Sequence, residues 1–160
     1  MALKFSDKAM KEFQSFETLF DNPKSKLIPT LYLAQREFGY LSQEVVDYVA
    51  SLMKLSSAKV MEVASFYTML HKKPVGKYEI QVCTNISCAM MKSRELYKHL
   101  EKKLNVKEGE VSNDKNFTIK KEECLGACDK APAIRINDTY HYNVTPEKMD
   151  KLLKDCENSK

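Results

Sequence analysis

Four cysteines in two pairs are the residues of this sequence best suited to bind a metal. Cys83 and Cys88 form a Cys-x4-Cys pair, and Cys124 and Cys128 form a Cys-x3-Cys pair. Each pair lies in a short loop that directly follows a predicted β-strand. Cysteine thiolates are the ligands of iron–sulfur clusters and of many zinc sites. We therefore expect both pairs to serve one metal centre.

The two pairs match the ligand requirement of a [2Fe–2S] cluster. Such a cluster needs four thiolates, two for each iron. We assign Cys83 and Cys88 to one iron, and Cys124 and Cys128 to the other, with one cluster per chain. Because no histidine belongs to this set, a low reduction potential is expected.

The cysteine loops also suit a centre of negative charge. Main-chain N–H groups of residues 84–87 and 125–127 can turn toward the sulfurs, and Gly126 permits a close approach of the backbone. A long helix predicted to begin near Cys88 would direct its positive N-terminal end toward the cluster. Further positive charge is expected from three cations: Arg94, Lys121 and Lys130.

Other uses of the cysteines remain open. A structural zinc site, in a protein that acts only as a scaffold, more often has Cys-x2-Cys loops. A thioredoxin-type dithiol needs Cys-x-x-Cys, which is absent. Cys156 lies on an apolar helical stripe, so it is predicted to be a buried free thiol. The three histidines have no partner at ligand spacing and are interpreted as cap, surface or packing residues: His71, His99 and His141.

The composition is that of a soluble globular protein. The chain has 160 residues, of which 43% are hydrophobic and 30% charged, and a net charge of +4. Lysines alternate with glutamates, which argues against nucleic-acid binding. No apolar run is long enough for a membrane span, and the N-terminus lacks the features of a signal peptide. We expect a reducing cytoplasm, where five cysteines favour metal binding over disulfides.

The chain divides at a basic segment with Pro and Gly, residues 72–76. Residues 1–73 are predicted to form a helical bundle that docks a partner, and residues 74–160 a domain that binds the cluster. Apolar spacing and the caps Ser6 and Ser42 support the bundle. Its helices are predicted over 6–20, 27–38, 42–53 and 57–68.

Four aromatic residues exceed what so small a bundle is expected to bury. They are Phe38, Tyr40, Phe66 and Tyr67. An unburied surplus would leave an apolar patch on the bundle surface. Such a patch would suit contact with a partner protein.

The second domain has a mixed pattern. A strand over 78–82 ends at Cys83, and a strand over 117–120 leads toward Cys124. Thr145 and Pro146 mark the start of a last helix. The remaining predicted elements are a helix over 88–104 and a hairpin of 133–136 with 140–143. This β-α-β-β-α order is similar to that of a trimmed thioredoxin-like domain, and the fold class is α+β.

Several motifs resemble one known family. Val82–Cys88 and Glu123–Cys128 hold the cysteines, and Val63–Met69 and Pro74–Lys77 precede them. Ala131-Pro132 and Thr145–Lys148 also match. The chain, over about residues 25–155, resembles the [2Fe–2S] E subunit of respiratory NADH dehydrogenase (complex I), in the thioredoxin-like ferredoxin family.

This resemblance implies a function in electron transfer. It implies that the four motif cysteines hold the cluster. The cluster would exchange electrons with the FMN of a larger flavoprotein subunit that binds NADH. It would not lie on the main route of electrons to quinone. No Gly-x-Gly-x-x-Gly run is present, so no NADH or FMN site is expected in this chain. The enzyme would be the whole complex, with this subunit peripheral on the cytoplasmic side of the inner membrane and not inserted in it. The same family also serves NAD-linked hydrogenases and formate dehydrogenases.

Overall fold

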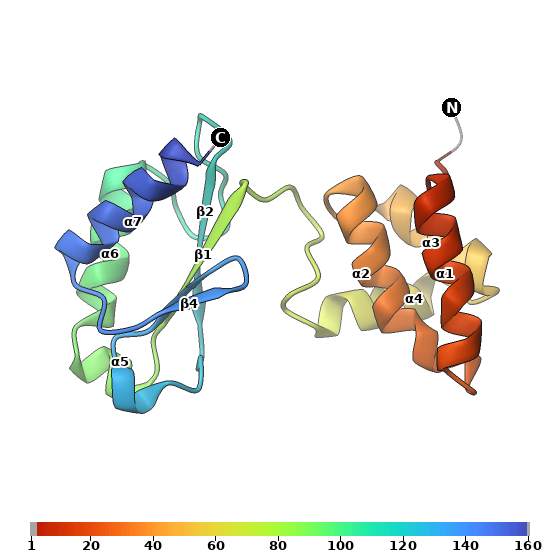
Figure 1. Ribbon diagram of the computed structural model, residues 1–160, viewed down its shortest axis with the longest axis horizontal. Coiled ribbons are helices and arrows are strands. Elements are labelled where there is room, and N and C mark those ends of the chain that lie inside the picture. Colours follow the sequence, from red (N-terminus) through yellow and green to blue (C-terminus); the bar gives the residue numbers. More distant parts are fainter. Residues whose placement is uncertain (1–2, 160) are drawn as a thin grey trace. The chain divides into compact units, whose positions relative to one another are not determined.

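The computed structural model describes residues 3–159 and has an α+β fold (Figure 1). The chain forms two compact units, of which the first ends at Pro74 and the second begins at Val75. The first unit is helical, and the second combines a four-stranded mixed sheet with helices. The predicted fold class is therefore confirmed. Within residues 3–159, no helix combines the length and the apolar character needed to cross a membrane.

Serine side chains begin three helices of the first unit. Ser6, Ser42 and Ser56 each accept a hydrogen bond from the main-chain N–H three residues later, which satisfies a donor that the helix leaves unpaired. The predicted helices are confirmed, but the last ends at Phe66 because Tyr67 is extended. The elements are α1 (Asp7–Leu19), the 3-10 helix η1 (Pro23–Lys26), α2 (Leu27–Phe38), α3 (Gln43–Met53) and α4 (Ser57–Phe66).

The first unit partly buries three of its four surplus aromatic residues. Phe38 stacks on Phe5 with ring centroids 5.7 Å apart, and both rings belong to the core of this unit or pack against it. Tyr67 also packs against this core, and Tyr40 is half-buried. Phe66 is the exception, since 77% of its surface is exposed. The predicted aromatic patch is therefore smaller than expected.

A four-stranded sheet in the order β2-β1-β3-β4 forms the framework of the second unit. Its strands are β1 (Tyr78–Cys83), β2 (Phe117–Glu122), β3 (Ile134–Ile136) and β4 (Thr139–His141). β1 and β2 are parallel, whereas β1–β3 and β3–β4 are antiparallel. The carboxyl ends of β1 and β2, which precede the two cysteine loops, therefore lie at the same edge of the sheet.

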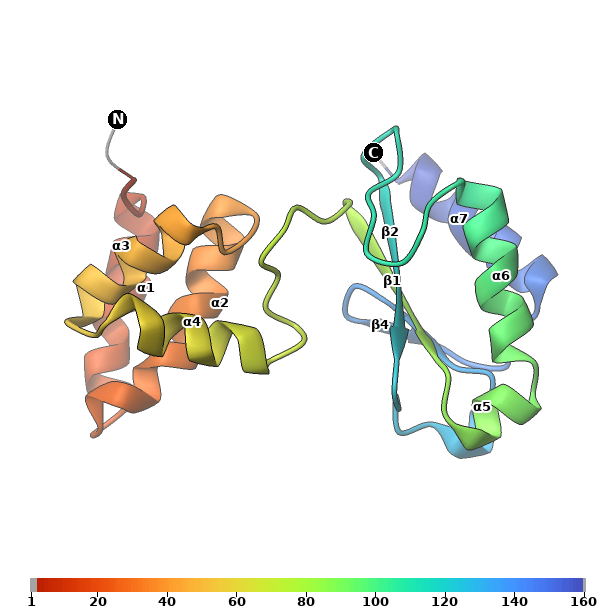
Figure 2. The same cartoon turned by 180° about the vertical axis from the view of Figure 1, so that it is seen from behind.

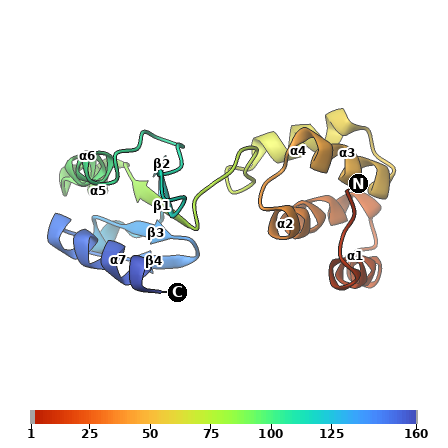
Figure 3. The same ribbon diagram turned by 90° about the horizontal axis from the view of Figure 1, so that it is seen from above.

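Two helices, α6 (Ser93–Leu104) and α7 (Pro146–Asn158), cover one face of this sheet (Figures 1 and 3). α7 starts as predicted, with the Thr145 hydroxyl accepting from the Lys148 N–H. Alternate residues of β1 point into the apolar layer between sheet and helices. This core includes Ile80, Val82, Leu96, Leu100, Ile119, Ile134, Met149 and Leu153.

The prediction of one long helix over residues 88–104 is wrong. The chain forms a five-residue helix, α5 (Ile86–Met90), and then α6. Lys92 separates them in a left-handed conformation with φ of 65°, which an α-helix cannot contain. The apolar pattern agrees with the break, since Met90 and Met91 are exposed whereas Leu96 is buried.

An ion-pair cluster joins the two helices that cover the sheet. Asp150 of α7 accepts from Lys103 and from His99 of α6, each at 2.7 Å from Oδ1. These hydrogen bonds, first that from Lys103 and then that from His99, lower the pKa of the Asp150 carboxyl below its ordinary value. His99 is thus a packing residue between helices, as predicted.

Candidate metal centre

The first cysteine pair is buried at the carboxyl end of β1. Cys83 is the last residue of β1 and Cys88 the third residue of α5, and they are 3% and 2% exposed. The Asn85 side chain accepts from the Ile86 N–H and so begins α5 directly after the strand. With Ala131 and Ala133 these thiols form a small apolar cluster of their own.

The second pair lies in the loop after β2, where both cysteines are exposed. The main-chain N–H of Gly126 donates to Sγ of Cys124 across 3.3 Å. Gly126 has φ of +69°, a left-handed conformation that glycine adopts without strain. Cys128 begins the 3-10 helix η2 (Cys128–Lys130), which contacts α5. Figures 1 and 2 show α5 and η2 together at one end of the sheet.

The thiols of Cys83, Cys88 and Cys128 interact electrostatically. Burial raises the pKa of the Cys88 thiol, a main-chain hydrogen bond from Ala133 opposes that rise, and hydrogen bonding with Cys83 and the charges of Cys83 and Cys128 add to it. Three of the four predicted cysteines therefore lie near one another. A bound metal ion would instead lower the pKa of the Cys88 thiol, because metals bind the thiolate form.

Cys124 is the member of the set that is not among the groups acting on the Cys88 thiol. Its loop nevertheless begins at the same edge of the sheet as the loop of Cys88, because β1 and β2 are parallel neighbours. In that part of the chain, no three His, Cys, Asp or Glu side chains have the mutual arrangement of a metal site. All five cysteines are free thiols. Four free thiols from two loops at one end of a sheet nevertheless fit the chemical requirement of a [2Fe–2S] cluster.

The three cations predicted near the cysteines have different surroundings. The Lys121 ammonium lies 3.0 Å from Glu108 Oε2. The Lys130 ammonium lies 5.0 Å from the ring centroid of Tyr142, which packs against the apolar cluster of Cys83 and Cys88. Lys130 thus stays close to the cysteine region, whereas Lys121 faces a separate pocket with Arg94.

Cys156 does not belong to this region. It is partly exposed, not buried as predicted, and lines a pocket with Tyr78 and His141. Tyr78 is the first residue of β1, so Cys156 lies at the opposite end of that strand from Cys83. Burial, and then Asp155 and Glu157, raise the pKa of its thiol. His71 packs at the end of the first unit, with its main-chain N–H donating to Gln35 Oε1.

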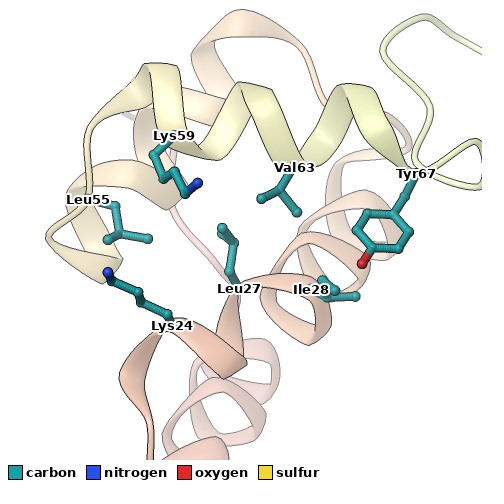
Figure 4. Close-up of a pocket in the computed structure, with 7 residues that line it drawn as sticks. All are labelled: Lys24, Leu27, Ile28, Leu55, Lys59, Val63 and Tyr67. Atoms are coloured by element: carbon teal, nitrogen blue, oxygen red, sulfur yellow. The ribbon is translucent and has the colours of Figure 1, made fainter.

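A small pocket in the first unit was not anticipated, because its residues come from distant segments. Its floor is apolar, with Leu27 and Ile28 of α2 opposite Val63 of α4 (Figure 4). The amino groups of Lys24 and Lys59 lie at one end and the Tyr67 ring at the other. Tyr67 also meets the exposed Phe66 edge to face, with ring centroids 5.1 Å apart. The pocket and Phe66 together form an apolar surface, with the Lys24 ammonium at its edge and the Lys59 ammonium paired there with Glu62.

The sequence matches the family model of the thioredoxin-like [2Fe–2S] ferredoxins over residues 11–157. The chain belongs to this family. The match spans both compact units and all four cysteines of the candidate centre. The family implies a [2Fe–2S] cluster, and the four free thiols match the number and type of donors that such a cluster requires.

The E subunits of two NADH-quinone oxidoreductases are similar to this chain over most of their length. The chain is 43% identical to the E subunit of the NADH-quinone oxidoreductase of Rickettsia felis, over 84% of this chain and 81% of the relative. It is 36% identical to an E subunit (E 2) of the NADH-quinone oxidoreductase of Rhizobium meliloti, over 90% of this chain and 86% of the relative. The family resemblance inferred from the motifs is thus confirmed.

One solved structure has a similar fold over both units. An NAD+-reducing [NiFe]-hydrogenase in the H2-reduced state gives a TM-score of 0.73 at 20% identity, over 84% of this chain. This chain spans only 22% of that hydrogenase chain. At this identity the likeness shows that the folds agree.

Proposed function

We propose that this protein is the electron-transfer iron–sulfur subunit of an NADH:quinone oxidoreductase, with one [2Fe–2S] cluster held by Cys83, Cys88, Cys124 and Cys128. One observation carries the proposal: both cysteine loops leave adjacent parallel strands at the same sheet edge in a chain of the [2Fe–2S] ferredoxin family. The extent of identity with named E subunits supports this enzyme in particular.

Residues of this chain would bind and shield the cluster. The buried pair, Cys83 and Cys88, would hold it from the interior, and the exposed pair, Cys124 and Cys128, from the surface. The Gly126 N–H, already a donor to Cys124, would stabilise negative charge on that sulfur. A bound cluster accepts and releases one electron at a time.

The subunit would act within a complex and not alone. The larger subunit that binds FMN and NADH is the expected partner, and the complex would keep this chain on the cytoplasmic face of the inner membrane. The first unit offers the docking surface. Its apolar pocket, with Lys24 and Lys59 at one end, would receive an apolar side chain flanked by a carboxylate, and Phe66 would extend the contact.

A test of the cofactor is metal analysis of the full chain purified without oxygen. We expect iron and acid-labile sulfide in equal amounts, a reddish-brown colour, and a paramagnetic signal after reduction by one electron. A colourless protein with stoichiometric zinc would instead support a structural zinc scaffold. Iron-free protein whose four thiols all react with an alkylating reagent would refute the cluster.

A second test identifies the complex. Affinity purification of the chain from its own cells should recover a flavoprotein subunit together with quinone-reducing components. Recovery of hydrogenase subunits instead would favour the alternative of an NAD-linked hydrogenase, whose similar fold is the observation in its favour. Formate dehydrogenase subunits would favour the third member of this family group.

A further inference from the structure

The second unit exposes three large apolar side chains beside a cysteine of the candidate centre. Ile86, Met90 and Met91 are 75%, 78% and 56% exposed. They lie in or directly after α5, the short helix that also contains the buried Cys88 and lies at the cysteine end of the sheet (Figure 2). Single exposed apolar residues are common in proteins, whereas a group of them marks a surface where another molecule binds.

The local backbone explains why this surface stays open. α5 has only five residues, of which Cys88 is the buried one. Lys92, in its left-handed conformation, ends the helical run, and the chain continues as α6, whose apolar residues face the sheet. No further turn of α5 therefore follows Met91 to bury these side chains. The second unit uses α5 to position Cys88 and leaves the largest apolar side chains of this segment exposed.

An aromatic pair with two cations lies close to the same region. Tyr142 packs against the apolar cluster that contains the first cysteine pair, and the partly exposed Tyr140 stacks on it with ring centroids 6.1 Å apart. The Lys130 ammonium lies 5.0 Å from the Tyr142 centroid, and the Arg135 guanidinium 5.9 Å from that of Tyr140. Neither cation makes an ion pair with a residue of the described range 3–159. Methionine, tyrosine and arginine are enriched in the contacts between proteins.

The proposed electron-transfer function decides which partner covers this surface. Electrons pass between two redox groups at a rate that falls steeply with the distance between them. A partner that exchanges electrons with a cluster on the four cysteines must therefore bring its redox group to this end of the second unit. A second copy of this chain would cover the same surface and supply no flavin. The partner should offer apolar side chains to α5 and carboxylates to Lys130 and Arg135.

We propose that Ile86, Met90 and Met91 form the contact through which the larger FMN-binding flavoprotein subunit covers the cysteine end of the second unit. This inference rests on the proposed function, and it adds a second contact to the one proposed for the first unit. Methionine side chains are flexible and polarisable, so they adapt to the shape of a partner. The partner then lies directly against the helix that contains Cys88.

Binding of the purified flavoprotein subunit to the immobilised full chain, prepared without oxygen, tests this surface. We expect the double variant Met90→Gln/Met91→Gln to bind at least about tenfold more weakly, because glutamine brings a polar amide into an apolar contact without a change of charge. Leu19→Gln is the matched control, since Leu19 is exposed on α1 of the first unit, and it should bind as the wild type does. Both variants should keep the iron content and the unfolding temperature of the wild type, because the replaced side chains are exposed.

Oxidation of methionine to its sulfoxide reports the same contact without a mutation. A short treatment of the free chain with hydrogen peroxide, followed by mass spectrometry, should modify Met90 and Met91. Met149 is fully buried and should stay unmodified, so it provides the baseline. Addition of the flavoprotein subunit before the peroxide should abolish most of the modification at Met90 and Met91.

The outcomes distinguish this surface from the proposed function. If the double variant binds as tightly as the wild type, and Met90 and Met91 stay reactive in the complex, the surface is refuted while the proposed partner is retained. If the wild-type chain with its cluster does not bind the flavoprotein subunit, the partner is refuted and the surface with it. Protection of Met90 and Met91 that rises with the concentration of the chain alone would assign the surface to a second copy and overturn the proposal.

Discussion

Cys83 of β1 lies opposite Glu122 of β2 in parallel register, and the next residue, Thr84, donates its N–H to the Glu122 carbonyl across 2.9 Å. The two strands therefore end side by side, and the chain leaves both at the same edge. This relationship fixes where the loops of Cys88 and Cys124 begin. Two cysteine pairs that are distant in sequence are thereby placed at one end of the sheet.

Replacing a cysteine of either loop should weaken or abolish binding of the cluster. We expect Cys83→Ser and Cys124→Ser each to lower iron and sulfide content strongly, and to reduce the stability of the second unit, because metal binding and folding are coupled. Iron analysis and the spectrum of the reduced protein measure the first effect, and thermal unfolding measures the second.

Cys156→Ser is the matched control for these two variants. Cys156 lies at the far end of β1 and lines a different pocket. Its replacement should leave the iron content and the reduced spectrum unchanged. If this variant lost iron while Cys124→Ser retained it, the proposed ligand set would be incorrect.

Gly126→Ala should disturb the exposed cysteine loop through its backbone alone. A Cβ atom at this position would meet nothing within 4 Å, so the cost arises from the left-handed φ and is about 1 kcal/mol. We expect this strain to shift the N–H that donates to Cys124. Iron should then pass to a chelator faster than from the wild-type protein, as followed by visible absorbance.

Gly109→Ala separates loop strain from general instability. Gly109 also has a left-handed φ, of +75°, and a Cβ atom added there would meet nothing within 4 Å, but it lies outside the cysteine loops. Its replacement should lower the free energy of unfolding by a similar amount and leave the rate of iron loss unchanged. Equal acceleration in both variants would mean that Gly126 has no specific role at the centre.

The sequence predicted elements best where local chemistry determines them. Caps at Ser6, Ser42 and Thr145 and apolar stripes located the helices, since these signals act within a few residues. The break at Lys92 had no such signal, because a left-handed conformation at lysine depends on tertiary packing. The cysteines could be identified from their spacing, but the pockets could not, since their linings join residues from separate segments.

The link between α6 and α7 should make stability depend on pH. The pKa of the Asp150 carboxyl is lowered in the folded state, by Lys103 and then by His99. The carboxylate therefore stabilises the fold above the unfolded pKa of about 3.9, and this contribution is lost as the pH falls through the folded pKa. Asp150→Asn should lower the free energy of unfolding by under about 1 kcal/mol near pH 6, because the pair is partly exposed.

The difference between Asp150→Asn and the wild type should shrink as urea unfolding is repeated at pH values falling from 6 toward 2. Asp155→Asn is the control, since Asp155 belongs to the same helix and makes no ion pair within residues 3–159. It should leave the pH profile unchanged. A constant difference between Asp150→Asn and the wild type at every pH would show that the ion pairs contribute nothing.

Phe66→Glu should weaken the proposed contact with the flavoprotein subunit. Phe66 is 77% exposed, so it contributes little to the core, and the variant should unfold at the wild-type temperature. Large aromatic side chains often dominate the binding energy of an interface. A carboxylate in its place would have to be buried without a matched cation, so affinity should fall by at least about tenfold.

Leu19→Glu provides the comparison for this change, because Leu19 is 68% exposed in the same unit, at the end of α1, and is not a residue of the pocket lining. Binding of the purified larger subunit to the immobilised chain measures both variants. We expect Leu19→Glu to bind as the wild type does. Equal loss in both variants would indicate a general effect of added negative charge, and retention of affinity by Phe66→Glu would place the contact on another surface.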